Sequence, residues 1–182
     1  SYNTIIGSVA GSAFTTGGEN TAVGRAAMYA TTNGTQNVAV GGQSLSSNTT
    51  GQYNTAVGYK ALDNNTTADN NTAVGKSVLA ANTTGASNTA VGVESLNVNT
   101  TGDNNVAVGK AALGANTTAD NNTAVGNSAM LANTTGNSNA ALGYQALEQN
   151  TTASDNTGIG YLALTDNTTG ARNTALGAAA LG

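Results

Sequence analysis

Residues 54–70 read NTAVGYKALDNNTTADN, and this 17-residue unit recurs along the whole chain. We number its positions 1 to 17 from Asn54, so that Gly58 stands at position 5. An asparagine opens each of eleven copies, at residues 3, 20, 37, 54, 71, 88, 105, 122, 139, 156 and 173, with no insertion or deletion between them. Separate units joined by loops tolerate insertions, whereas units stacked residue over residue lose their register. The constant spacing therefore predicts a stack of coils.

The unit predicts short strands rather than helices. Its apolar stretches are short and are bounded by Gly and Asn, as strands and turns are. We expect one strand over residues 55–57, a second over Ala61 and Leu62, and a third extended piece at the threonine pair of residues 66 and 67. The expected fold is all-β, a parallel β-solenoid (β-roll) of eleven 17-residue coils that start at Asn3 and then every 17 residues to Asn173, as a single domain over residues 1–182. At about 4.8 Å per coil, the rod would be about 50 Å long.

Alternation along the strands predicts which side chains face inward. Val57 and its equivalents form one column, Ala56 and its equivalents form the next, and Leu62 beside Ala61 repeats the pattern. We expect the large column to fill the coil and the small column to lie outside. Burying one Val and one Leu contributes about 1.5 to 3 kcal/mol each, while ordering the backbone costs about 1 to 2 kcal/mol per residue. Burial of a second face is therefore expected, which predicts a homo-oligomer, a trimer or another bundle.

The composition leaves few groups for chemistry. The chain has no His and no Cys, and only 8% of its residues are charged. Nucleophilic triads and metal sites of the usual kinds need those residues. Asp69, Asp103 and Asp120 share position 16, but the other copies carry no acid there, so no carboxylate pair recurs and solvated turn residues are expected. We predict a protein that is not an enzyme, with no catalytic, metal-binding or cofactor-binding residues.

Charge and hydropathy argue against two classes of partner. A formal net charge of -4 and only five Lys and Arg residues do not fit nucleic-acid binding, which needs clustered basic side chains. No apolar run is long enough to span a bilayer, so no membrane insertion is expected. The opening residues Ser-Tyr-Asn-Thr do not resemble an export signal, and we expect any such signal to have been removed.

The opening asparagines predict a structural ladder. Each amide carries a donor and an acceptor, so stacked asparagines can bond along a solenoid. The ladder would hold Asn20, Asn37, Asn54, Asn71, Asn88, Asn105, Asn122, Asn139, Asn156 and Asn173. The glycine at position 5 is expected to supply a turn that other residues do not adopt.

A second asparagine column matches the pattern for N-glycosylation, because each member begins Asn-Thr-Thr. These candidates are Asn48, Asn65, Asn82, Asn99, Asn116, Asn133, Asn150 and Asn167. An O-linked alternative uses Thr49, Thr66, Thr83, Thr100, Thr117, Thr134, Thr151 and Thr168. Coils about 4.8 Å apart leave little room for branched sugars, so a turn ladder of Asn and Thr is the other interpretation.

Two further functions remain open. Threonine columns can order water for ice binding, although Thr66 and Thr67 are expected to point to opposite faces. Side chains that vary from coil to coil, such as Tyr59, Tyr144 and Lys76, could read a receptor or a glycan. A disordered linker does not explain the fixed columns of Val and Leu.

The strand motif Asn-Thr-Ala-Val-Gly, followed by Ala-Leu and a glycine-bearing turn, resembles the Ser-Val-Ala-Ile-Gly repeats of trimeric autotransporter adhesin heads. It is also similar to repeats of phage and viral tail fibres. The resemblance covers Asn3 to Leu181, but the unit here is longer and its Asn-Thr-Thr segment is additional. It implies a left-handed parallel β-roll in a homotrimer, and a structural role in an extracellular fibre, adhesin stalk or tail fibre at a cell or virion surface.

Both ends lack the polar cap that solenoids usually need. The first copy carries Ile5, Ile6 and Val9, and the last ends in the run Ala178 to Gly182. We expect either a segment of a longer protein or subunits that stack end to end into a filament.

Overall fold

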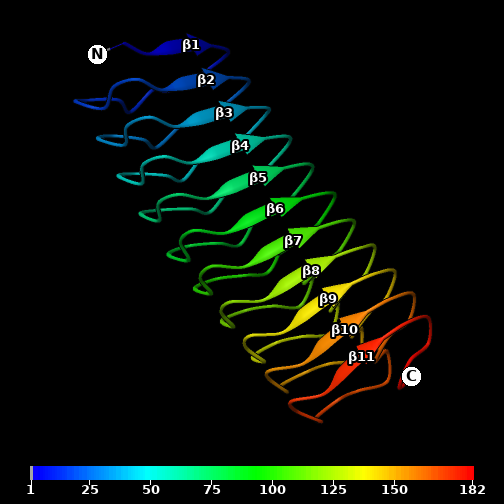
Figure 1. Ribbon diagram of the computed structural model, residues 1–182. Helices are drawn as coiled ribbons and strands as arrows, with labels where there is room; N and C mark the ends of the chain where they lie inside the picture. Colours follow the sequence, from blue (N-terminus) through cyan, green and yellow to red (C-terminus); the bar gives the residue numbers. More distant parts are fainter. Residues whose placement is uncertain (1) are drawn as a thin grey trace.

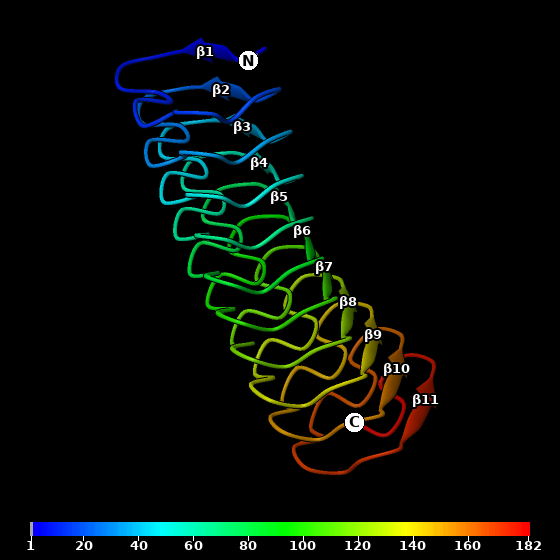
Figure 2. The same cartoon turned by 90° about the vertical axis from the view of Figure 1, so that its left-hand side faces the viewer.

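The computed structural model describes residues 2–182 as a rod in which the chain coils from one end to the other (Figures 1 and 2). Each coil, which we call a rung, contributes one three-residue strand. The strands are β1 (Thr4–Ile6), β2 (Thr21–Val23), β3 (Val38–Val40), β4 (Thr55–Val57), β5 (Thr72–Val74), β6 (Thr89–Val91), β7 (Val106–Val108), β8 (Thr123–Val125), β9 (Ala140–Leu142), β10 (Thr157–Ile159) and β11 (Thr174–Leu176).

All eleven strands form one parallel sheet in sequence order. Equivalent residues pair directly, as Ala56 does with Ala73 and Val57 with Val74. The strands therefore lie in a column along one side of the rod (Figure 1). The predicted all-β parallel solenoid with a 17-residue rung is confirmed, and so is the strand predicted over residues 55–57.

The prediction of a second strand at Ala61 and Leu62 is wrong, and so is that of a third extended piece. The pair at residues 61 and 62 lies in a turn, with φ of 56° at Lys60 and 52° at Leu62, and the threonine pair lies in a bend. A left-handed residue on each side of Ala61 breaks the extended conformation that a strand requires. Backbone bonds between rungs nevertheless continue through this turn, with Lys60 N–H donating to Gly42 O at 3.1 Å and Leu62 N–H to Val78 O at 3.0 Å.

The predicted assignment of the inner and outer columns is also wrong. Ala56 is fully buried, whereas Val57 is half-buried and faces outward. Ala61 and Leu62 are both buried instead of facing opposite sides. The large residue at position 9 crosses the interior from the turn side, so only a small side chain fits opposite it on the strand.

The glycine at position 5 ends each strand with a conformation that other residues avoid. Gly58 has φ of 133°, and its equivalents lie between 123° and 140°. A Cβ at Gly92 would come within 2.6 Å of the carbonyl oxygen of Gly109. Close approach of successive rungs thus adds to the backbone requirement for glycine.

Candidate functional site

The first asparagine column is buried and joined from rung to rung. The Asn37 Oδ1 atom accepts hydrogen bonds from the Asn54 backbone N–H at 2.9 Å and from the Asn54 Nδ2 at 3.2 Å. The Asn54 Nδ2 also donates to the Ala68 carbonyl at 2.8 Å, across the interior of the rung. Equivalent bonds to the preceding asparagine's Oδ1 recur from Asn20 to Asn173. The column therefore has a structural role in the interior.

The second asparagine column, which was the candidate for N-linked glycans, is buried as well. Asn65 has no exposed surface, and its Nδ2 donates to Asn48 Oδ1 at 3.1 Å and to Ala68 O at 3.1 Å. An N-linked sugar would replace one of these donors and has no room in the rod. This placement speaks against glycans on the folded chain. The same holds for Asn48, Asn82, Asn99, Asn116, Asn133 and Asn150, while Asn167, near the C-terminal end, is half-buried.

The two threonines that follow this asparagine have different surroundings. Thr66, a candidate for O-linked sugars, is half-buried, and its hydroxyl donates to the Thr83 carbonyl at 3.1 Å. Its neighbour Thr67 is exposed. Most members of the candidate column, from Thr49 to Thr151, donate in the same way to the next rung. The two threonine columns accordingly do not form one paired array of exposed hydroxyls.

Position 16 carries a bond between rungs that sequence reasoning missed. Asp69 Oδ1 accepts the backbone N–H of Gln52 at 2.7 Å, and Asp103 Oδ1 accepts that of Ala86 at 2.7 Å. Asp120 Oδ1 accepts the N–H of Asp103 at the same distance. These side chains are half-buried, not simply solvated turn residues. The signal in the sequence is the frequency of short polar side chains at this position.

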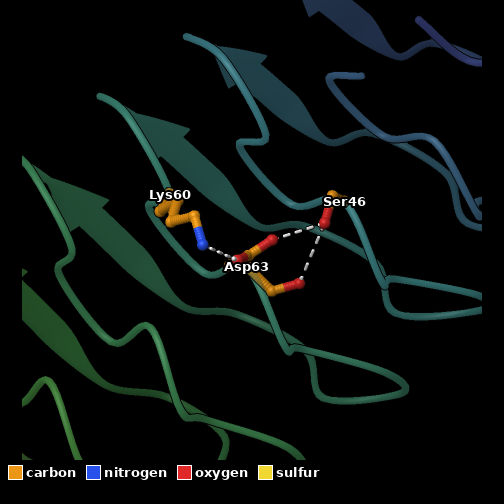
Figure 3. A network of polar contacts seen from close by, with 3 residues as sticks. All are labelled: Ser46, Lys60 and Asp63. Carbon is orange, nitrogen blue, oxygen red and sulfur yellow. Dashed lines mark hydrogen bonds and ion pairs between the residues drawn. The ribbon is translucent and has the colours of Figure 1, made fainter. Parts of the chain in front are cut away.

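A small polar network joins two neighbouring rungs in the turns that follow their strands (Figure 3). Ser46 Oγ donates to Asp63 Oδ1 at 2.5 Å, and Lys60 Nζ lies 3.6 Å from Asp63 Oδ2. Within residues 2–182, this is the one ion pair. Each of the three side chains has its bonding partner within this network. We therefore interpret the network as a structural contact between rungs.

The surface of the described residues is hollowed near the N-terminal end of the rod. A shallow hollow is lined by Thr16, Gly18, Glu19, Thr35 and Gln36. In the part of the chain that the structure covers, no group of three His, Cys, Asp or Glu side chains could hold a metal ion. The same part contains no helix of the length and hydropathy needed to cross a bilayer.

The outer surface of the sheet is a continuous and largely aliphatic surface along the rod. We call it the sheet face, and it consists of the first and third residues of every strand from β1 to β11, at positions 2 and 4. These residues are all Thr, Val, Ile, Leu or Ala. Val40 is 37% exposed and Leu142 is 48% exposed, so large aliphatic side chains reach solvent.

Exposed tyrosines lie beside this face. Tyr59, Tyr144 and Tyr161 stand at position 6, and the rings of Tyr144 and Tyr161 stack with centroids 5.6 Å apart. Tyr144, a predicted candidate for receptor or glycan binding, therefore stacks on a tyrosine of the neighbouring rung. The sequence matches no protein-family model, no curated protein and no solved structure.

Proposed function

We propose that this chain is a structural rod, a segment of an extracellular fibre or stalk at the surface of a cell or a virion. The observation that carries the proposal is the continuity of bonding between rungs. Strand, turn, both asparagine columns and position 16 all bond to the neighbouring rung, as at Ala56, Lys60, Asn54, Asn65 and Asp69.

This bonding supports a mechanical role. Unfolding one rung in the middle breaks ladder bonds on both of its sides, and each contributes about 0.5 to 1.5 kcal/mol net. Ends frayed by one rung leave the rest of the stack intact, because each rung contacts only its neighbours. A rod of this kind holds two points at a fixed separation of about 50 Å per eleven rungs.

The experiment locates the chain on its source particle. Antibodies raised against the purified rod are applied to intact cells or virions and visualised by immunogold electron microscopy. We expect gold along thin projections at the surface. Labelling that appears only after the particle is broken open would overturn the proposal. Antibodies against the unfolded chain serve as the control for specificity.

A further inference from the structure

The sheet face is bordered by two flanks of opposite charge. We call position 6, directly after each strand's glycine, the trailing flank, and positions 16 and 17 of the preceding unit the leading flank. The charged side chains of the trailing flank are Arg25, Lys76 and Lys110, all basic and all exposed. The leading flank carries Glu19, Asp69, Asp103, Asp120 and Asp155, with Arg172 as its one basic member.

The basic residues of the trailing flank and acidic residues of the leading flank also border the same strands along the rod. Arg25 trails β2 and Glu19 leads it. Lys76 and Asp69 border β5 in the same way, and Lys110 and Asp103 border β7. Each basic residue of the trailing flank thus has an acidic residue on the leading flank that borders the same strand. The intervening strand holds the two apart within one chain, and among residues 2–182 the one ion pair is Lys60 with Asp63.

We infer that a second copy of this chain packs on the sheet face, with its rod axis parallel and with equal rungs side by side. A parallel copy facing this surface must be turned about the rod axis. Its strands then cross the face in the opposite direction, so its leading flank meets the trailing flank of the first copy. In a ring of three or more copies, the trailing flank of each chain likewise meets the leading flank of the next.

Charge complementarity selects this arrangement over the antiparallel one. In register, Arg25 meets Glu19 of the second copy, Lys76 meets its Asp69, and Lys110 meets its Asp103. An antiparallel copy would place trailing flank against trailing flank, and basic side chains would face each other. Like charges placed in contact oppose association, and complementary ones fix its register.

An aromatic pair agrees with the same register. Tyr53 leads β4 and Tyr59 trails it, and they are 54% and 49% exposed. Parallel packing in register brings Tyr59 of one chain to Tyr53 of the other. Tyrosines are enriched at interfaces because they bury a large apolar area and still bond through the hydroxyl.

The area shows why the flanks matter. Three strand residues across and eleven rungs along cover about 500 Å² per chain, at about 3.3 Å per residue and about 4.8 Å per rung. A stable interface buries about 800 Å² per partner. The rest of the buried area has to come from side chains of the two flanks. The sheet face is therefore sufficient only together with its flanks, where the complementary charges lie.

Zero-length cross-linking of the unmodified chain tests this contact. A carbodiimide joins a carboxylate to an amine as an amide and itself takes up the water. The products are separated on a denaturing gel, and the cross-linked peptides of each band are identified by mass spectrometry. We expect bands of two or more chains to contain Lys76 joined to Asp69 and Lys110 joined to Asp103. The pair Lys60 and Asp63, 3.6 Å apart within one chain, is the internal control that the reagent worked.

Matched charge variants extend the test. Lys76→Gln should raise the dissociation constant of a dimer, measured by analytical ultracentrifugation, about twofold to thirtyfold, since both chains carry the change and two exposed ion pairs are lost. Asp166→Asn removes one charge from an exposed turn residue at position 11, outside the sheet face and both flanks, and should leave the constant unchanged. A wild-type chain that stays monomeric at high micromolar concentration overturns the inference. So do bands of several chains in which Lys76 is joined only to acids of other rungs, or equal effects of the two variants.

This inference deepens the proposed function by naming the partner, and the two can fail separately. Cross-links in register without surface labelling would remove the fibre role and keep the interface. Surface labelling together with a monomeric chain would keep the fibre role and remove the interface.

Discussion

At the scale of single residues, fold stability depends on columns of identical side chains, and an exception in a column is informative. The glycine at position 5 has no exception in eleven rungs, because its left-handed φ and the carbonyl of the next rung both exclude a side chain. The asparagine column at position 12 has two exceptions, Phe14 and Thr31. These columns yield two predictions.

Gly92→Ala should lower the free energy of unfolding by about 2 to 4 kcal/mol. The new Cβ would meet the Gly109 carbonyl oxygen, and φ is 123° at this position. Gly42→Ala is the matched control, because the nearest atom to its Cβ would be a tyrosine ring carbon at 3.5 Å. Urea unfolding followed by circular dichroism measures both variants. Equal losses would contradict the role assigned to position 5.

Thr31→Asn should raise the free energy of unfolding by about 1 kcal/mol. The Thr31 hydroxyl is buried without a hydrogen-bond partner, whereas asparagine could donate to the Gly34 carbonyl and accept from Asn48, in the way that Asn65 donates to Ala68 and accepts from Asn82. The reverse change, Asn65→Thr, should cost about 1 to 3 kcal/mol because it interrupts the ladder. Thermal unfolding of the two variants gives the comparison, and a loss from Thr31→Asn would show that the column does not extend to this rung.

At the scale of the element, each strand has a small inner residue and two outer ones. On β6, Ala90 is fully buried, and Thr89 and Val91 face outward. Leu96 comes from the turn of the same rung and is also fully buried. The strand is therefore held by the turn that packs against it, and its outer residues are available for contacts with another chain.

Exchanging sizes on β6 tests which side chain faces inward. Ala90→Val should cost about 1 to 3 kcal/mol, since the interior has no space for two more carbons. Val91→Thr keeps the shape at an outward position and should change the free energy of unfolding by about 0.5 kcal/mol or less. Denaturant unfolding of both variants measures the two changes in the free energy of unfolding. A greater loss for Val91→Thr would restore the opposite arrangement, with valine inside.

At the scale of the whole molecule, stability grows by addition of equal rungs. The rungs contact only their neighbours in sequence, so the length of the rod is set by the number of units. Constant rung length is then a requirement of every bond between rungs, and not of the strands alone.

Deleting residues 88–104, one complete rung, should preserve the fold and shorten the rod by about 4.8 Å. Inserting a single serine between Thr89 and Ala90 should instead cost about 3 kcal/mol or more, because the strand beyond it turns its other face inward. Small-angle scattering measures the length, and thermal unfolding measures stability. An insertion variant as stable as the parent would contradict the stacked arrangement.

Much of this architecture follows from the sequence alone. The 17-residue period without insertions sufficed for a parallel stack, because only direct superposition makes rung length invariant. The strand at residues 55–57 and the turn at Gly58 followed from local preferences.

Only the tertiary structure decided which columns face inward and how the rest of the rung runs. Alternation states that Ala56 and Val57 face opposite ways, but it does not say which is inside. The answer depends on Leu62, which reaches across from a left-handed turn that leucine does not favour by itself. Likewise, the pattern Asn-Thr-Thr describes a surface sugar site equally well, until the coil closes around Asn65 and buries it. Local sequence preferences depend on the residues directly before and after a position. The side chains that lie opposite that position inside a narrow coil come from residues further along the same unit.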